Sequence, residues 1–247
     1  MSCGDDERAV TAPESLFHGR LKILQKAKGY RFSIDAVILG HHIPLRGMDM
    51  GVDLGTGCGI IPLILAHRGS SARLYGIEIQ KDLAEMASRN VRLNHMEDRI
   101  TIVHGDMRDF RSYLEPGVVD VVFSNPPYRN VLSGRINPDP ERAVARHEIK
   151  GTLSAVVSVA EKLLRPSGRL WVIYPAERIA DLLAQMRAFS LEPKRLRLVH
   201  SRPNSDAELV LAEGRKQGRH GLKVVPPLIV HKEDGGYTDE VKEMIGE

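Results

Sequence analysis

The stretch Val52-Asp53-Leu54-Gly55-Thr56-Gly57-Cys58-Gly59 decides how this chain folds. Its apolar start is typical of a buried strand, and its glycines allow a tight turn in which a ligand lies against bare backbone. The turn leads into residues 59–67, which have helical spacing. A glycine-rich turn between a strand and a helix is typical of α/β proteins that bind a ligand at one edge of a sheet.

Strand-like and helical segments alternate along most of the chain. The expected strands cover residues 48–54, 72–79, 100–105, 118–124 and 168–174, and the expected helices cover residues 59–67, 80–93, 152–164 and 176–189. This alternation predicts an α/β fold with a mostly parallel sheet and helices on both faces. Further strand-like runs at residues 195–200, 207–213 and 222–231 predict an antiparallel edge.

The composition is typical of a globular protein. With 42% hydrophobic and 27% charged residues, a chain of 247 residues can bury a large core, and one main domain is expected. No stretch approaches the ~20 apolar residues of a membrane span, and residues 1–8 lack the apolar core of a secretion signal. The cysteines, Cys3 and Cys58, are too few for a disulfide framework or a cysteine metal cluster. We therefore expect a cytoplasmic protein.

Charge is unevenly distributed along the chain. Residues 14–46 hold six bases against two acids, and residues 193–232 hold nine bases against three acids. Residues 233–247 reverse the sign, with six acids against one base. The basic segments are either an ordinary solvated surface or a local field that attracts a polyanion.

The spacing of the glycine turn favours one class of cofactor. A dinucleotide site prefers Gly-x-Gly-x-x-Gly, whereas this turn reads Gly-x-Gly-x-Gly with Asp53 two residues before Gly55. The Asp53 carboxylate would repel a phosphate and attract a cation. S-adenosylmethionine carries an ammonium and a sulfonium and no phosphate, so we expect it as the cofactor. A purely structural turn is the alternative.

Further acidic residues stand at the ends of the next two expected strands. Glu78 can accept hydrogen bonds from both ribose hydroxyls or cap the following helix, and Asp106 can accept one from an adenine amino group. The carboxyl ends of parallel strands meet at one edge of a sheet, so these groups are expected together. The expected cofactor contacts are Asp53, Gly55, Thr56, Gly57, Gly59, Glu78, Ile79, Asp106, Met107 and Asn125.

The fourth expected strand runs directly into Asn125-Pro126-Pro127-Tyr128. The prolines fix the backbone and remove its N–H donors, so the Asn125 side-chain oxygen and the Pro126 carbonyl can both accept hydrogen bonds from one amino group. Holding the hydrogens of a planar amine favours a pyramidal nitrogen whose lone pair points at a methyl donor. Tyr128 can stack on a flat substrate that has left its own stack. This motif predicts methylation of a planar amine by alignment and electrostatics.

These motifs resemble the class I S-adenosylmethionine-dependent amino methyltransferases over about residues 48–213. Within that class, the sequence is similar to the bacterial tRNA adenine-N(6) methyltransferases that modify the adenine beside the anticodon of a valine tRNA. The closer resemblance rests on residues 25–39, 146–148, 226–230 and 236–240, and therefore spans nearly the whole chain.

The resemblance implies a Rossmann-like fold whose mostly parallel, seven-stranded sheet ends in an antiparallel edge strand. It implies that residues 125–128 are catalytic, that Phe32 and Asp35 close over the cofactor, and that tRNA is the partner. We expect a basic extension of residues 1–47 packed on a methyltransferase domain of residues 48–232, followed by an acidic tail. A metal is not expected, and neither is an assembly beyond a monomer or weak dimer.

The Asn-Pro-Pro-Tyr motif leaves other substrates open. A glutamine side chain of a translation release factor is also a planar amide, although enzymes of that kind usually carry a longer helical domain before the first strand. Guanine amines of ribosomal RNA are a further possibility, although those relatives more often have Phe at the Tyr128 position. A non-catalytic RNA-binding or cofactor-sensing module is the alternative of a different class, and the intact Asn125 argues against it.

Other conspicuous residues are expected to be structural. His41 and His42 are adjacent, so on a helix they point about 100° apart, and no partner at ligand spacing makes a metal site of them. Cys58 fits the glycine turn as a small residue, without a second thiol for redox chemistry. Trp171 is expected in the core.

Overall fold

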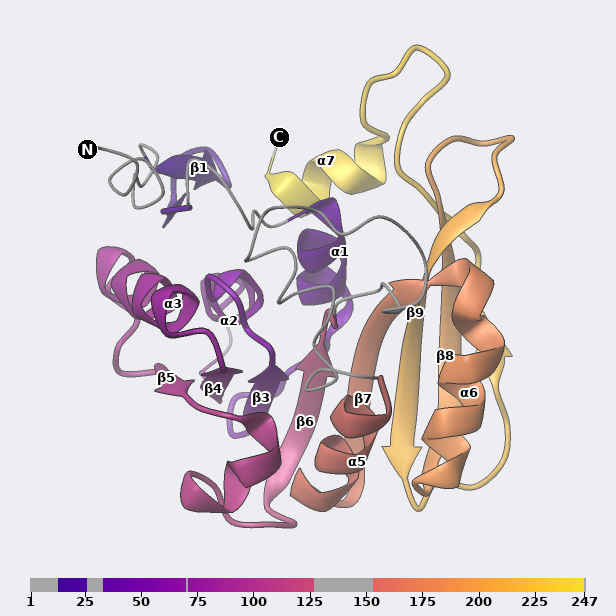
Figure 1. Cartoon of the computed structure of the whole chain (residues 1–247). Coiled ribbons are helices and arrows are strands. Elements are labelled where there is room, and N and C mark those ends of the chain that lie inside the picture. Colours follow the sequence, from indigo (N-terminus) through magenta and orange to yellow (C-terminus); the bar gives the residue numbers. More distant parts are fainter. Residues whose placement is uncertain (1–12, 26–32, 70, 127–152, 247) are drawn as a thin grey trace, which may run out of the picture.

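The protein is described here by a computed structural model, in which residues 13–25, 33–69, 71–126 and 153–246 are placed (Figure 1). Within these residues nine strands form one sheet in the order β10-β8-β9-β7-β6-β3-β4-β5, with β11 also paired to β8. The parallel part consists of β3 (Met50–Leu54), β4 (Arg73–Glu78), β5 (Ile100–His104), β6 (Val119–Ser124) and β7 (Leu164–Pro175). All five correspond to expected strands, and the predicted α/β fold is confirmed, although the expectation of seven strands was wrong because the short strands β10 and β11 also join the sheet.

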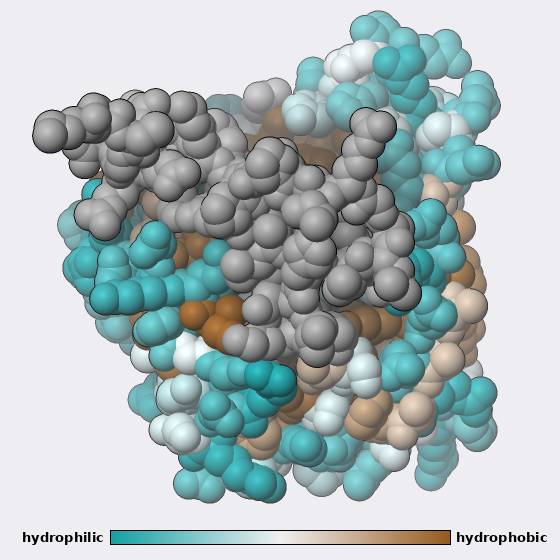
Figure 2. Space-filling model, viewed as in Figure 1, coloured by the Kyte–Doolittle hydropathy of each residue, from teal (hydrophilic) through white to brown (hydrophobic). Residues whose placement is uncertain are grey.

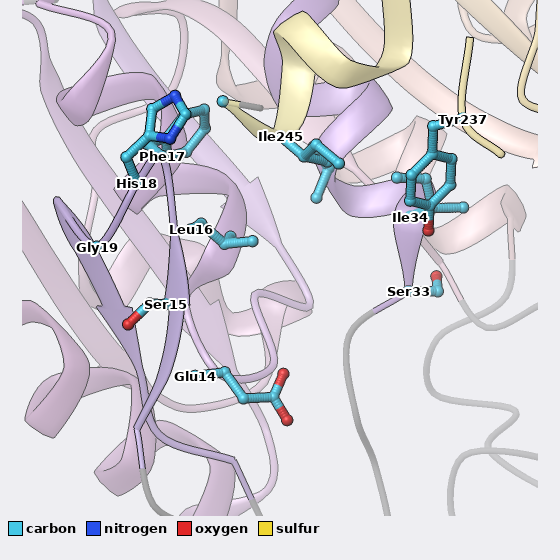
Figure 3. Close-up of a pocket in the computed structure, with 12 residues that line it drawn as sticks. Glu14, Ser15, Leu16, Phe17, His18, Gly19, Ser33, Ile34, Tyr237 and Ile245 are labelled. Carbon is cyan, nitrogen blue, oxygen red and sulfur yellow. The ribbon is translucent and has the colours of Figure 1, made fainter.

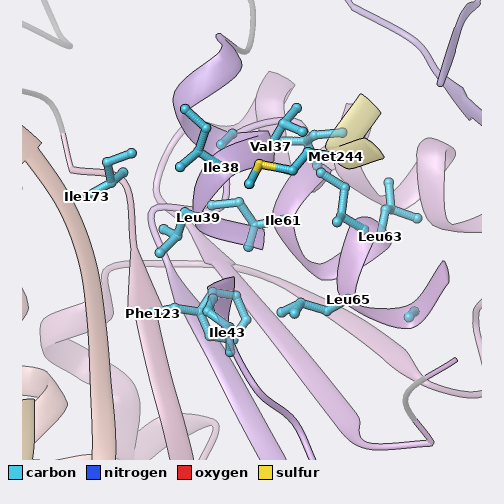
Figure 4. Packing of buried hydrophobic residues seen from close by; sticks show 14 of the residues in the cluster. Val37, Ile38, Leu39, Ile43, Ile61, Leu63, Leu65, Phe123, Ile173 and Met244 are labelled. Carbon is cyan, nitrogen blue, oxygen red and sulfur yellow. The ribbon is translucent and has the colours of Figure 1, made fainter. Parts of the chain in front are cut away.

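Helices cover both faces of the sheet. They are α1 (Ile34–His42), α2 (Ile60–His67), α3 (Lys81–Leu93), α5 (Leu153–Leu163), α6 (Ile179–Ala188) and α7 (Asp239–Ile245), with short helical turns η2 (Met107–Ser112) and η4 (Ala176–Arg178). Side chains alternate between two separate hydrophobic clusters: Phe123 of β6 packs with α1 and α2, whereas Val122 packs with α5 and α6. Figure 4 shows the first cluster, in which Phe123 and Ile173 of the sheet lie near Leu39 of α1. Trp171 lies in the same cluster, as predicted.

The far side of the sheet differs in detail from the expectation. The chain passes from β7 through η4 and α6 to β8 (Leu191–His200) and then turns back as β9 (Ala207–Lys216), which lies antiparallel between β7 and β8. The antiparallel strand is therefore internal. The reason is burial: residues 210–212 of β9 are fully covered, whereas β8 alternates apolar residues with Arg195 and Arg197. Two short strands, β10 (Lys223–Val224) and β11 (Leu228–Ile229), run parallel to β8 at its outer side.

The segments on either side of the central domain contribute to the same core. The hairpin of β1 (Glu14–Leu16) and β2 (Leu21–Ile23) and the helices α1 and α7 lie above the carboxyl ends of the parallel strands in Figure 1. Leu21 of β2 and Val241 of α7 are fully buried, and the Phe17 amide donates a hydrogen bond of 3.0 Å to the Ile245 carbonyl. The hydrophobic core thus includes residues on both sides of the boundaries expected after residues 47 and 232. The division of the chain at these boundaries stays a prediction.

On the face shown in Figure 2, hydrophilic residues cover most of the described surface. No helix among the described residues is both long enough and apolar enough to cross a membrane.

Asn90 of α3 and Asn94, which caps the end of that helix, hold the hairpin in place. The Asn90 side chain accepts a hydrogen bond from the Leu24 amide (2.7 Å) and donates to the Leu24 carbonyl (3.0 Å), and Asn94 makes the same two bonds to Lys22 at 2.9 and 2.7 Å. Asn90 also donates to the carbonyl of Cys58 in the glycine turn, at 2.9 Å. This asparagine pair therefore pairs with β2 as a neighbouring strand would, and it connects the hairpin to the turn after β3.

We expect Asn90→Ala to lower the free energy of unfolding by about 3 kcal/mol, because it leaves one buried N–H and two carbonyls without their partner. Asn94→Ala is the matched control: it removes the bonds to Lys22 from an exposed site, so its expected cost is about 1 kcal/mol. Urea denaturation of both variants measures the difference. Equal losses would show that the contact with Cys58 adds nothing to stability.

Candidate cofactor and catalytic site

The glycine turn is held by its own backbone conformation. Gly55, Gly57 and Gly59 have φ angles of 76°, 58° and 82°, which side chains other than glycine rarely adopt. The amides of Gly55 and Thr56 both donate to the Ile77 carbonyl, at 2.9 and 3.1 Å. Within the described part of the chain, no atom beyond the neighbouring residues lies within 4 Å of the position that a Cβ at Gly55 would take. With respect to these residues, the turn thus presents bare backbone to open space, as a ligand-binding loop requires.

Asp53 lies beneath this turn with its carboxyl group fully buried. One oxygen, Oδ2, accepts a hydrogen bond of 2.8 Å from the Thr56 hydroxyl, while Oδ1 is buried without a partner among the described residues. Burial, above all, raises the pKa of Asp53 to about 7. A buried carboxylate with an unsatisfied oxygen is costly unless a donor or a cation reaches it. The residues present therefore fit the ammonium group of S-adenosylmethionine.

Glu78 at the end of β4 supports the turn from the other side. The residue is 5% exposed, and its carboxylate accepts hydrogen bonds from the Gly57 and Gln80 amides, both at 2.9 Å. Burial raises its pKa. The Gln80 amide precedes the first turn of α3, and no side-chain capping bond is present at that helix start. The contact with Gly57 shows that Glu78 positions the glycine turn.

Asp106 follows β5 and contacts a neighbour that the sequence reasoning missed. The Arg108 guanidinium donates to both carboxylate oxygens of Asp106, with Nε–Oδ1 and Nη2–Oδ2 distances of 3.0 and 2.5 Å. An adenine amino group would therefore share this carboxylate with Arg108. Of the neighbouring expected contacts, Ile79 exposes 37% of its surface, whereas Met107 is buried.

Asn125 and Pro126 come directly after β6, next to the glycine turn. Asp53 of β3 is in register with Phe123 of β6, so the chains leave the sheet side by side at Gly55 and Asn125. The Ser124 hydroxyl donates to the Leu54 carbonyl at 2.7 Å and ties the two strand ends together. The ends of β6, β3, β4 and β5 thus bring together the expected groups from Asn125 to Asp106.

Some expected site residues cannot be placed in this arrangement. Phe32, Pro127 and Tyr128 lie outside the described residues. Asp35 is in the first turn of α1, an element separate from the strand ends that carry the other expected groups.

Two further residues shape the turn although the sequence reasoning passed over them. A Cβ at Gly76 of β4 would lie 2.8 Å from the Thr56 side chain, so only glycine lets the turn pack on β4. Asn90 is fully buried. The sequence could have indicated this residue, because it is polar and occupies an apolar position of the helical repeat in residues 83–91.

The adjacent histidines have structural contacts. The Phe17 ring stacks between His41 and His67, with centroid distances of 5.8 and 4.6 Å. His42 contacts the Ile38 carbonyl through Nδ1 (2.8 Å) and Arg197 through Nε2 (2.6 Å). Within the described part of the chain, no group of three or more His, Cys, Asp or Glu residues could hold a metal ion.

The Cys58 thiol, in the glycine turn itself, is buried. Burial raises its pKa to about 12, which keeps the thiol protonated and unreactive at neutral pH.

Comparison with known proteins defines the class. The family described as methyltransferase small domain matches residues 31–187, which include the glycine turn and Asn125 to Tyr128. The chain belongs to this family and is a methyltransferase.

Similar sequences narrow the class further. Over 232 residues the chain is 34% identical to the tRNA1(Val) (adenine(37)-N6)-methyltransferase of Porphyromonas gingivalis strain ATCC 33277, with 90% of this chain and 89% of that protein covered. It is 33% identical to the protein of the same name from Tolumonas auensis, over 61% of each chain.

Solved structures show the same fold. A predicted O-methyltransferase from Agrobacterium tumefaciens superimposes with a TM-score of 0.69 at 23% identity and covers 85% of this chain and 94% of its own. The TYW2 protein of P. horikoshii, in complex with MeSAdo, superimposes with a TM-score of 0.57 at 14% identity, covering 80% and 69%.

Proposed function

We propose that this enzyme transfers a methyl group from S-adenosylmethionine to the exocyclic N(6) amine of an adenine in tRNA, the adenine beside the anticodon of a valine tRNA. The observation that carries the proposal is the placement of Asn125 and Pro126 beside the acidic glycine turn, through the register of β6 with β3. The names and the high mutual coverage of the similar sequences support the tRNA substrate. A cytoplasmic location follows from that substrate.

Each side chain of the site has a defined task in this reaction. S-adenosylmethionine, when bound, supplies the electrophilic methyl group. Asp53 binds the ammonium group, and Glu78, which already holds the turn, has lone pairs left for ribose hydroxyls. Asn125 and the Pro126 carbonyl accept the hydrogens of the adenine amine and aim its lone pair, while Tyr128 stacks on the ring. Phe32 and Asp35 cover the cofactor.

The hairpin favours RNA over a protein substrate. Arg20 and Lys22 are exposed on it, and no carboxylate among the described residues pairs with either side chain. In contrast, several bases of residues 193–232 are already neutralised, since Arg197, Lys216 and Lys232 form ion pairs with Glu240, Glu161 and Asp239. Arg20 and Lys22 therefore present positive charge on the side of the sheet where the site lies.

The direct test of the function is incubation with radiolabelled S-adenosylmethionine and, in parallel, unmodified total tRNA, ribosomal RNA and a release factor. We expect label in tRNA, released on digestion as N(6)-methyladenosine. Label on release-factor glutamine would keep the fold and the cofactor and overturn the substrate. Label in ribosomal RNA as a methylated guanine would do the same.

Binding of unmodified tRNA is expected to weaken steeply as salt rises from about 50 to 200 mM, because Lys and Arg contacts to phosphates release counterions. Arg20→Ala combined with Lys22→Ala should lower the slope of log K against log salt by roughly 2, about 1 for each phosphate contact. The control removes the same charge at the opposite end of the sheet, with Arg219→Ala and Lys223→Ala. An unchanged slope in the hairpin variant would exclude these phosphate contacts.

A further inference from the structure

A partly open cavity lies between segments that are far apart in the sequence. It has a volume of about 490 Å³ and is lined by the β1–β2 hairpin, the start of α1, Tyr237 and the end of α7 (Figure 3). Its size is within the ~300–1,000 Å³ typical of small-ligand sites. Among the described residues, none of those assigned to the cofactor or to the amine lines this cavity.

The hairpin places this cavity next to the glycine turn. Glu14 of its wall is in register with Ile23 of β2. The following residue, Leu24, is bonded to Asn90, which also donates to the Cys58 carbonyl of the turn. On the opposite wall, Ser33 is two residues before Asp35. A ligand in the cavity would thus lie close to whatever occupies the cofactor site.

The lining combines apolar walls with polar groups directed inward. Leu16, Ile34 and Ile245 supply apolar surface. In Figure 3 the Glu14 carboxylate extends from one wall toward the Tyr237 hydroxyl on the other, and the Ser33 hydroxyl lies near that tyrosine.

Two of these polar groups are held in orientation by neighbours outside the cavity. The buried Gln25 side chain donates to Glu14 Oε2 at 2.8 Å. The Tyr237 ring stacks on His231, with a centroid distance of 5.1 Å. A flat ligand with an apolar face and hydrogen-bond donors on its edge matches this lining.

We propose that the cavity takes the base of a nucleotide adjacent to the target adenine in the substrate RNA. The inference rests on the proposed function: a target adenine that reaches Asn125 must leave its stack, which exposes the faces of its neighbours. A neighbouring base regains apolar contact between Leu16 and Ile34 and donates an exocyclic amino hydrogen to Glu14. Arg20 and Lys22 of the same hairpin are then in reach of its phosphates. Adenine, cytosine and guanine carry such an amine, and uracil does not.

The test compares stem-loop RNAs that contain the target adenine and differ only in the nucleotides on its two sides. For the wild-type enzyme, uridine at the contacted side should lower kcat/KM about tenfold relative to an amino-bearing base, as expected for one lost base contact. Glu14→Gln should abolish this preference: its amide oxygen still accepts the bond from Gln25, and an NH₂ group, which only donates, replaces the other carboxylate oxygen. Glu233→Gln, an exposed acid outside the cavity, changes the net charge equally and should keep the preference.

A second readout is independent of turnover. In a stem-loop with 2-aminopurine at the contacted side, fluorescence should rise on binding to the wild type, because the analogue unstacks. Ser33→Trp, which fills the cavity from an exposed position, should suppress the rise, with the affinity for S-adenosylmethionine unchanged. Suppose that the wild type methylates the unaltered stem-loop, that Glu14→Gln keeps the base preference and that Ser33→Trp keeps the rise in fluorescence. The cavity proposal is then wrong and the proposed function stands. If the wild type methylates no RNA, both are wrong.

Discussion

Replacement of Asn125 by alanine is expected to lower kcat for tRNA methylation about 100-fold, in line with the loss of one group that acts mainly in the transition state. The Asn125 oxygen would no longer hold the adenine amine, whose lone pair would stay delocalised into the ring. Affinity for S-adenosylmethionine should be nearly unchanged, since the ammonium, ribose and adenine contacts come from other strand ends. Single-turnover kinetics and calorimetric titration of the cofactor measure the two quantities separately.

A matched control for this variant is Asn204→Ala, which removes the same side chain from the exposed turn between β8 and β9. It should leave both quantities unchanged. Full activity of Asn125→Ala would exclude Asn125 from the mechanism. A parallel loss of cofactor affinity would instead assign Asn125 to cofactor binding.

Asp53→Asn is expected to change cofactor affinity and protein stability in opposite directions. The variant cannot pair as an anion with an ammonium group, so affinity for S-adenosylmethionine should fall about 10- to 100-fold, corresponding to the ~1.5–3 kcal/mol of a charge-assisted hydrogen bond. Without cofactor, however, the variant avoids burying a charge whose Oδ1 has no partner among the described residues. We expect it to be more stable than the wild type at pH 8 by about 2 kcal/mol, or roughly 5 °C in Tm.

The effects of Asp53→Asn on stability and on cofactor affinity should both depend on pH. Because the folded-state pKa of Asp53 is raised to about 7 from 3.8, protonated Asp53 stabilises the fold at low pH, and this contribution is lost as pH rises through about 7. The stability advantage of Asp53→Asn should therefore be larger at pH 8 than at pH 5. Cofactor binding to the wild type should weaken below pH 7, about tenfold at pH 6, and this dependence should vanish in the variant. Equal pH profiles for both proteins would show that Asp53 does not control cofactor binding.

Much of the fold could be predicted from the sequence because its signals are local. The glycine turn, the Asn-Pro-Pro-Tyr motif and each strand-like or helix-like pattern of apolar residues lie within a short stretch. The strands and helices of the described central domain accordingly lie close to where they were expected. The family and the α/β fold are confirmed. The roles of Asp53, Glu78, Asp106 and Asn125 remain predictions.

What the sequence did not disclose depends on contacts between distant segments. β9 lies inside the sheet because it is more buried than β8. The apolar pattern of the two strands alone does not tell which of them is more buried. The pairing of Asn90 with Leu24 joins residues 66 positions apart. The Gly76 requirement arises only because Thr56 packs against β4.

The meeting of hairpin and final helix has a consequence for how the enzyme is made. Phe17 is among the first described residues to leave the ribosome, yet its amide bonds to Ile245, and Gly246 packs so closely on Phe17 that a side chain there would collide with it. The central domain can fold during synthesis, since its strands and helices follow one another along the chain. The hairpin acquires its last anchor only when α7 emerges. A nascent chain that stalls before residue 239 therefore contains the glycine turn but lacks the contact with Ile245 that anchors the hairpin.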